Sequence, residues 1–348
     1  MCRLRGSGTR RLARRRTGTA MNSRTRIALI SNPRSTGNIA QLPRIRAYCD
    51  GHPDVFHYEV EHAHQVGEAL RTIARIEPKV LVINGGDGTV QAALTELHNG
   101  GHFGDHTPPV AVLPSGKTNL IALDLGAVGD PVEALERLLE IARTDLTPYI
   151  VDRELIALRH GEAGGAPVIG MFMGGAGLAD TMLYCRDKIY PLGLPNGVAH
   201  VLTAIALLFK MLLKIKANFL PPDPQHLNVS VRDEDNDLSG RFSLLAVTTL
   251  EKLLLSNELD GKEEAGGVLK LVAIEERPVS LVRAFAASLG GNLGRQNLRG
   301  VHFGRANHIT IHGDSSDVIL DGETFRAVTG SPIHLQLAQP LSFVKLAA

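Results

Sequence analysis

Residues 79–89, with the sequence KVLVINGGDGT, decide the fold of this 348-residue chain. The first six residues are a short apolar run typical of a buried strand, and TVQAALTELHNG, which starts at Thr89, has the pattern of a helix. Glycines in such a turn let backbone amides approach a phosphate group, and a helix N-terminus adds partial positive charge. A turn of this kind can also serve tight geometry alone, but a carboxylate inside it is unusual for that role. The stretch therefore predicts a phosphate-binding loop formed by Gly85, Gly86, Asp87, Gly88 and Thr89.

Strands and helices alternate on both sides of this loop. An apolar run that starts near residue 26 ends in Asn-Pro and Gly, residues 66–77 have helical spacing, and the apolar run 108–114 leads through a polar loop into LIALDLG. Continuous apolar strands alternating with helices are typical of a parallel α/β sheet. Beyond about residue 150 the pattern predicts a mostly antiparallel β half. Its strand segments are RELIALRH (153–160), HLNVSVRD (226–233), RFSLLAVTTL (241–250), VLKLVAI (268–274), HITIHG (308–313) and IHLQLAQ (333–339), and RDEDNDLSG (232–240) is expected to be a solvated hairpin connection.

A second polar loop follows the apolar run 108–114. Its end resembles a nucleotide-binding P-loop, with Ala111 in place of the first glycine. The apolar run continues through Leu113 and Pro114 removes an amide, so too few flexible residues remain to form the amide nest of a true P-loop. Because this loop also follows a strand, we still expect it to face the ligand of the glycine loop. The residues concerned are Gly116, Lys117, Thr118 and Asn119.

An acidic turn, Asp321-Gly322-Glu323, stands between two apolar segments near the end of the chain. Asp-Gly is the commonest hairpin turn, and on its own this turn needs no other role. Two carboxylates one residue apart can also supply a general base for an alcohol nucleophile and a metal ligand. We treat Asp321 and Glu323 as candidate catalytic residues because they accompany the two loops. Asp87 is the candidate Mg²⁺ ligand, with ordering of a ribose or of its own loop as the alternative.

The charge balance argues against nucleic acid as a partner. Lys and Arg total 37 against 36 Asp and Glu, and aromatic residues make up only 4% of the chain. Nine arginines and no acid fall within residues 1–26, so subtracting nine from the net charge of +1 leaves about −8 for the rest. We predict that residues 1–25 form a basic, disordered extension and that translation starts at Met21, with an arm for anionic lipid as the alternative.

Several features predict a cytoplasmic protein. No apolar segment follows the arginines as a secretory signal would require. The three cysteines, Cys2, Cys49 and Cys185, are widely spaced, so neither a disulfide framework nor a thiolate zinc site is indicated. Residues 198–219 are strongly apolar, but lysines interrupt them before the length that a bilayer span needs. They predict either a packed helix or one that lies on a membrane surface.

The order and separations of four motifs resemble those of the diacylglycerol kinase catalytic domain family, which includes bacterial lipid kinases and sphingosine kinases. The motifs are NPRSTGN (32–38), GGDGT (85–89), LPSGKTN (113–119) and LDGE (320–323). The resemblance covers about residues 26–345. It implies an α/β nucleotide-binding domain with a parallel sheet over 26–150 and a mostly antiparallel β-sandwich lipid domain over 151–339. Residues 340–348 form a C-terminal segment that can return to the first domain.

The resemblance also implies site residues. Asn32, Pro33 and the glycine loop would bind ATP, and the proton acceptor would lie at or near Asp321 and Glu323. The chain departs from the family pattern where Lys117 replaces a threonine and Leu120 an aspartate. Where some members support a structural metal with an Asp-Gly-x-Leu segment, residues 266–269 read Gly-Gly-Val-Leu, so we expect that metal site to be absent.

We therefore expect an ATP- and Mg²⁺-dependent lipid kinase, a transferase that phosphorylates a hydroxyl of diacylglycerol or a related lipid in phospholipid biosynthesis. Its expected partners are the lipid substrate and, as a peripheral contact, the inner membrane surface, while a homodimer is left open. One alternative is a kinase for a soluble substrate, of the NAD kinase or phosphofructokinase type, since these share a GGDG loop. Another is a catalytically impaired nucleotide-binding protein, because of Lys117 and Leu120.

Overall fold

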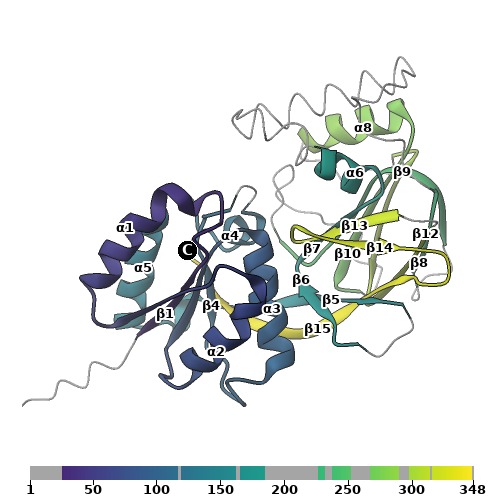
Figure 1. The fold of residues 1–348 in the computed structure, drawn as a ribbon. Helices are drawn as coiled ribbons and strands as arrows, with labels where there is room; N and C mark the ends of the chain where they lie inside the picture. The colour runs from purple at the N-terminus through teal and green to yellow at the C-terminus, as the bar shows by residue number, and fades with distance from the viewer. Residues whose placement is uncertain are drawn as a thin grey trace, which may run out of the picture.

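The structure is a computed structural model that describes residues 26–116, 119–161, 165–184, 226–231, 237–251, 267–289, 298–313 and 316–346. Within these residues the chain forms an α/β half and a β-rich half, which lie side by side in Figure 1. Strands of the first half are parallel, and those within the second half are antiparallel. The fold class predicted from the sequence is therefore confirmed.

The α/β half contains a parallel sheet with the strand order β2-β1-β3-β4. Residues of β1, β3 and β4 are buried throughout, which explains why these strands read as continuous apolar runs. Because the order reverses between β1 and β3, their carboxyl ends form a topological switch point, where open α/β sheets bind ligands. The strands are β1 (Ile27–Ser31), β2 (Val55–Glu59), β3 (Val80–Asn84) and β4 (Val110–Val112).

Five α-helices connect or cover these strands. Local sequence fixes several of their ends: Asp130 caps α5 by accepting hydrogen bonds from Val132 N (2.8 Å) and Glu133 N (3.3 Å), and Gly101 ends α3 with a left-handed φ of 58°. The helix predicted over residues 66–77 ends earlier, at Ala74. The helices are α1 (Asn38–Asp50), α2 (Val66–Ala74), α3 (Asp87–Gly100), α4 (Leu120–Asp124) and α5 (Pro131–Arg143), with 3₁₀ turns at Ala63–Gln65 and Thr147–Tyr149.

The β-rich half is built from two layers of strands. One contains β5, β15, β12 and β8, and the other contains β14, β13, β7, β9 and β10, while β9 pairs with β8 and so joins the layers. Side chains such as Ile311 and Val247 meet in the core between them. The strands are β5 (Ile150–His160), β6 (Val168–Gly170), β7 (Phe172–Gly175), β8 (His226–Val231), β9 (Leu238–Thr248), β10 (Leu269–Glu275), β11 (Val301–Ala306), β12 (His308–Gly313), β13 (Ser316–Leu320), β14 (Glu323–Ala327) and β15 (Ile333–Val344).

Two helices of this half, α6 (Gly177–Tyr184) and α8 (Pro278–Leu289), are not predicted from the sequence. The helix predicted over residues 198–219 lies outside the described residues. Residues 238–240, which the sequence analysis assigned to a hairpin connection, are instead the start of β9, because they pair with β8. Among the helices formed by the described residues, none is long and apolar enough to cross a membrane.

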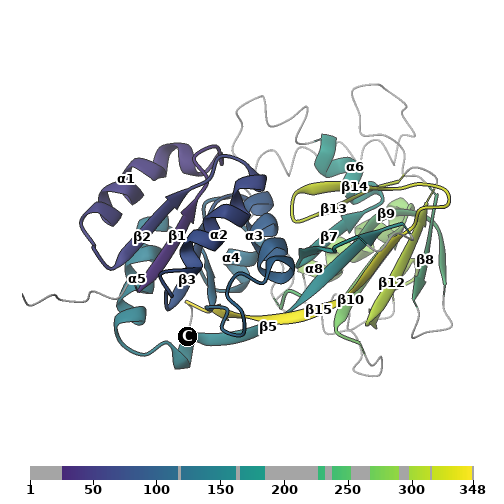
Figure 2. The ribbon, with the colours of Figure 1, turned by 60° about the horizontal axis from the view of Figure 1, so that its bottom comes forward.

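Strand β15 runs from the β-rich half into the α/β half, as Figures 1 and 2 show. It pairs antiparallel with β5 along most of its length, and near its end Phe343 pairs with Val110 of β4. Phe343, Val344 and Leu346 are buried in the core of the α/β half. Residues 343–346 are therefore part of the core of the α/β half, although strand β15 begins in the other half.

Candidate active site

Buried polar side chains form hydrogen bonds at the carboxyl ends of β1 and β3. Asn84, the last residue of β3, is fully buried and donates from Nδ2 to Ser31 Oγ over 2.9 Å. Asn38 donates from Nδ2 to the carbonyl oxygens of Asn32 and Asn84, at 2.9 Å each. Asn32 in turn donates from its Nδ2 to Thr89 Oγ1 over 2.9 Å. These bonds hold both strand ends, and the loops that follow them, in one fixed arrangement.

The glycine loop (residues 85–89) lies at the switch point and opens α3. Gly86 precedes the helix with an extended backbone (φ −79°, ψ 175°), so Asp87, Gly88 and Thr89 form its first turn. The Thr89 amide donates to Gly86 O over 2.9 Å, and amides of a first helical turn that lack an acceptor within the helix can bind an anion. Gly85 has no room for a side chain, since a Cβ there would lie 2.6 Å from Thr89 Cβ. Residue type and position in the fold both favour a phosphate-binding loop.

The second loop (residues 114–119) lies against the loop that follows β1. Ser35 Oγ donates to Ser115 O over 3.3 Å, and Gly37 packs so closely on that carbonyl that a side chain at residue 37 would collide with it. Gly116 N donates to Asn119 Oδ1 over 2.5 Å. Asn119 has a left-handed φ of 54°, which Asn tolerates better than most residues, and α4 begins directly after it.

The acidic turn (residues 321–323) is the tip of the hairpin formed by β13 and β14, where Leu320 pairs with Glu323. Asp321 is 6% exposed and has a left-handed φ of 42°. Its carboxyl accepts hydrogen bonds from Met171 N at Oδ2 (2.7 Å) and from Phe172 N at Oδ1 (3.1 Å). Asp321 is thus a hairpin-turn residue and also anchors the tip of the hairpin to the connection between β6 and β7.

The acidic turn meets the glycine loop at the start of α3. A Cβ placed on Gly88 would lie 2.6 Å from Glu323 Oε1. One placed on Gly322 would lie 3.6 Å from Asp87 Cβ and 3.6 Å from the Gly88 nitrogen. In Figures 1 and 2 the β13–β14 hairpin extends from the β-rich half towards the α/β half. The absence of a side chain at residue 88 permits the close approach of Glu323, whereas at residue 322 glycine suits the left-handed φ of 93°.

The second loop also touches the glycine loop. A Cβ on Gly116 would lie 3.3 Å from Gly86 Cα and 3.6 Å from Asp87 Oδ1. The two loops and the acidic turn, which come from three distant parts of the sequence, therefore lie together at one edge of the sheet. Such an arrangement can present amides and a hydroxyl to a phosphate chain and carboxylates to its terminal group.

The acidic turn contains a carboxyl with a strongly shifted pKa. The pKa of Asp321 is raised from 3.8 to about 7, chiefly because the side chain is buried, and the charge of Asp87 adds to the increase. The hydrogen bonds from Met171 N and Phe172 N favour the charged form and oppose the shift. Perturbed carboxyls of this kind are common at functional sites.

The diacylglycerol kinase catalytic domain matches the sequence over residues 26–148, the part of the chain that contains both loops. This part of the chain is therefore similar to the catalytic domain of diacylglycerol kinases. The match supports a kinase, that is, a transferase of phosphoryl groups. No curated protein matches the sequence.

The α/β half and the β-rich half together have a known fold. The structure of "A putative diacylglycerol kinase from Bacillus anthracis str. Sterne" covers 92% of this chain and is itself covered to 97%, with a TM-score of 0.61 and 16% identity. The crystal structure of a diacylglycerol kinase from the same strain gives the same coverage, a TM-score of 0.57 and 15% identity. At this identity the likeness shows the fold alone.

The departures from the family pattern at Lys117 and Leu120 fall in the second loop and at the first residue of α4. Leu120 is partly buried and packs against the core of the α/β half, so an apolar contact stands where the family usually has a carboxylate. Lys117 and Thr118 lie outside the described residues, and their place beside the ligand stays a prediction. Pro33 lies half-buried in the turn after β1, next to Asn32.

Sequence reasoning missed the polar layer beneath the two loops. Asn38 Oδ1, Asn84 Oδ1 and Ser115 Oγ are buried and have no hydrogen-bond partner among the described residues. An amide at the end of the otherwise apolar strand VLVIN was the one available signal for Asn84. The backbone donors of Met171 and Phe172 gave no signal, because any residue type supplies them.

Proposed function

We propose that the chain is an ATP-dependent lipid kinase that phosphorylates a hydroxyl of diacylglycerol or a related lipid. The observation that carries the proposal is the contact of the acidic turn with the glycine loop, which brings Glu323 to the N-terminus of α3 beside Gly88. The family of residues 26–148 supports the phosphoryl-transfer chemistry. A lipid acceptor would require the chain to contact a membrane surface at least transiently.

The glycine loop and the second loop would hold the phosphates of ATP. The absence of side chains at Gly85, Gly86 and Gly116 lets the loops pack closely on one another at the N-terminus of α3, where backbone amides can bind phosphate. Mg²⁺ bound with ATP would neutralise phosphate charge, and Asp87 is the residue that would hold it. Within the described residues no group of three or more His, Cys, Asp or Glu side chains could hold a metal, which suits a cation bound by substrate phosphates and one or two carboxylates.

Glu323 is better placed than Asp321 to accept the proton of the lipid hydroxyl. Both oxygens of Asp321 accept backbone hydrogen bonds inside the protein, whereas Glu323 is exposed and reaches the start of α3. In the proposed step the hydroxyl oxygen forms a bond to the γ-phosphorus while the bond to the bridging oxygen breaks and ADP leaves. The hydroxyl proton passes to the Glu323 carboxylate, and Asp321 holds the turn in place.

Incubation with γ-labelled ATP, Mg²⁺ and a panel of acceptors tests the proposal. The panel contains diacylglycerol and sphingosine in mixed micelles, and NAD and a hexose phosphate in buffer. Label in the organic phase supports a lipid kinase, and its distribution among lipids identifies the preferred acceptor. Label confined to NAD or the sugar would instead establish a soluble-substrate kinase. Bound nucleotide without transfer to any acceptor would indicate a nucleotide-binding protein without this activity.

A further inference from the structure

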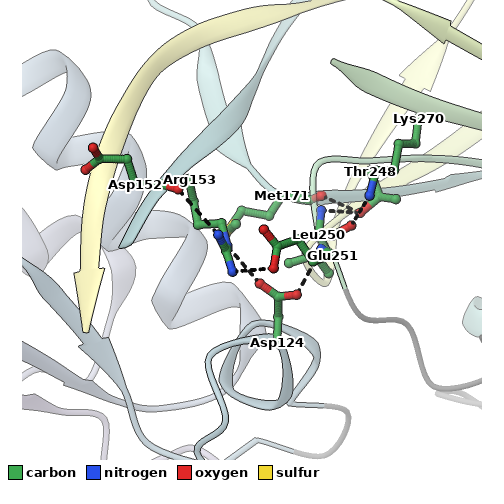
Figure 3. A network of polar contacts seen from close by, with 8 residues as sticks. All are labelled: Asp124, Asp152, Arg153, Met171, Thr248, Leu250, Glu251 and Lys270. Atoms are coloured by element: carbon green, nitrogen blue, oxygen red, sulfur yellow. Dashed lines mark hydrogen bonds and ion pairs between the residues drawn. The ribbon is translucent and has the colours of Figure 1, made fainter. Parts of the chain in front are cut away.

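An ion-pair network with a buried Arg153–Asp124 pair and an exposed Glu251 joins α4 to the β-rich half, as Figure 3 shows. Arg153 of β5 donates from Nε to Asp124 Oδ2 (3.1 Å) and from Nη2 to Glu251 Oε2 (2.8 Å). The backbone N–H of Glu251 donates to Asp124 Oδ1 over 2.9 Å. The side chain of Asp124 is 0% exposed and that of Arg153 is 8% exposed, so their charges depend on partners within the protein rather than on water.

On one side this network reaches the second loop. Asp124 is the last residue of α4, a helix of five residues that begins directly after Asn119. Leu123 N donates to Asn119 O over 2.8 Å, and the Asn119 side chain accepts from Gly116 N. Because α4 is so short, a displacement of Asp124 is transmitted to Asn119 and from there to Gly116.

On the other side the network reaches the acidic turn. Leu250, which precedes Glu251, donates from its backbone N to Thr248 Oγ1 over 3.0 Å, and that hydroxyl donates to Met171 O over 2.9 Å. Met171 N is the donor to Asp321 Oδ2. A continuous series of hydrogen bonds and one peptide bond therefore links the acidic turn to Glu251. Glu251 is linked through Arg153 to Asp124, and so to the second loop.

We propose that Arg153 is a positioning residue that holds the second loop at a fixed position relative to the acidic turn. Its effect on turnover rests on the proposed function, whereas its effect on the coupling of the two segments does not. In phosphoryl transfer the protein contributes mainly alignment and charge stabilisation, and a misplacement of about 1 Å can cost on the order of 10²-fold in rate. The bonds within the glycine loop do not involve Arg153, so ATP affinity should fall less than turnover when the alignment of the second loop is lost.

Two variants interrupt the network at different points. Arg153→Met removes the charge that bridges Asp124 and Glu251 but keeps an unbranched side chain. Thr248→Val replaces the hydroxyl between Leu250 and Met171 with a methyl group of similar size. Arg159→Met is the matched control, because Arg159 lies on the same strand and donates to Gly165 O, outside the network.

Hydrogen exchange of backbone amides gives a readout that does not depend on activity. In either network variant we expect the exchange rate of backbone amides to rise about tenfold both in α4 and at residues 171–172, although the substituted residue lies in neither segment. Steady-state kinetics with the preferred lipid should show turnover lower by about 10- to 100-fold, a larger loss than that of ATP affinity, to which the second loop also contributes. Arg159→Met should change none of these quantities, and Arg153→Lys should restore part of the turnover.

Faster amide exchange confined to the mutated site would overturn the proposal. An equal loss of turnover and of ATP affinity would also overturn it, as would the changes in exchange and turnover expected of the network variants if they appeared in the Arg159→Met control. If Arg153→Met does not fold, Thr248→Val carries the test, since it keeps every charge of the network. If the wild-type chain transfers phosphate to no lipid, the proposed function fails, whereas the exchange data still decide whether the two segments are coupled.

Discussion

At the scale of single residues, Asp321 and Glu323 show how two carboxyls in one turn can differ in function. Asp321 is buried and bonded through both oxygens, and its left-handed backbone forms the turn. Glu323 is exposed and lies at the start of α3. The first carboxyl is therefore suited to shaping the turn and the second to exchanging a proton with a substrate.

Glu323→Gln should lower turnover by about 10²- to 10⁴-fold, the usual contribution of a general base. The ATP dissociation constant should stay nearly unchanged, because the two loops keep their own hydrogen bonds. Single-turnover kinetics and equilibrium binding of ATP measure the two quantities separately. Thr324→Val, at the adjacent exposed position, is the control, and equal turnover in the Gln variant and this control would remove Glu323 from the mechanism.

Asp321→Asn should change how stability depends on pH. With a pKa of about 7 in the folded chain and the usual 3.8 in the unfolded chain, Asp321 binds more protons when folded between about pH 4 and pH 7. Its contribution to the free energy of unfolding therefore falls as the pH rises through this interval. The stability of the wild type relative to Asp321→Asn should accordingly be higher at pH 5 than at pH 8, by more than about 1 kcal/mol.

Urea unfolding of both proteins at the two pH values measures this difference. Asp105→Asn, at an exposed position, is the control for a general effect of removing a carboxylate. A stability difference between wild type and Asp321→Asn that stays constant from pH 5 to pH 8 would contradict the raised pKa of Asp321.

At the scale of elements, the site depends on how closely three loop backbones approach one another. Gly37, at the start of α1, packs on Ser115 O, and Gly51, at the other end of the same helix, has ordinary space around it. The two glycines have similar helical backbones, with φ −70° and −80°, so neither needs glycine for its conformation. Only at residue 37 is glycine required, because a side chain there would collide with Ser115 O.

Gly37→Ala should therefore separate the first and second loops and weaken ATP binding by about tenfold or more, since misplaced phosphate contacts are lost. Gly51→Ala should leave ATP affinity unchanged, because its Cβ would lie 3.5 Å from Tyr48 O, an ordinary contact. Isothermal titration with ATP compares the two variants. Equal affinities would show that the contact at Ser115 does not shape the nucleotide site.

Much of the element pattern was predictable because strand and turn signals are local. The apolar runs at β1, β3 and β4 predicted buried parallel strands, and each candidate loop follows a strand or turn signal. The edge strand β2 was harder to recognise, since four of its five residues are only partly buried. The polar layer at Asn84 and the network at Arg153 were not predictable, because they depend on which distant segments pair in three dimensions.

At the scale of the whole molecule, β15 makes the two halves one structure. It pairs with β5 and β12 in the β-rich half and ends beside β4 in the α/β half. Its Phe343 side chain is fully buried in the core of the α/β half. The halves should therefore unfold together rather than as independent domains.

Phe343→Ala should lower the free energy of unfolding by about 3–5 kcal/mol, since it removes a large buried ring. Ser342→Ala is the control, because the neighbouring Ser342 Oγ makes only an exposed hydrogen bond to Asp152. Urea unfolding followed by circular dichroism and by hydrogen exchange of β10 should give one shared transition in both variants. Two separate transitions, of which only one shifts in Phe343→Ala, would contradict this coupling.

The position of β15 in the chain also has a consequence for synthesis. Its partners β4 and β5 leave the ribosome long before it does, so in the nascent polypeptide the backbone groups that β15 will pair remain open. Unpaired strand edges of this kind favour aggregation and recruit chaperones. Cells that produce the protein in excess should thus accumulate aggregates most readily from translation products that stop short of residue 333.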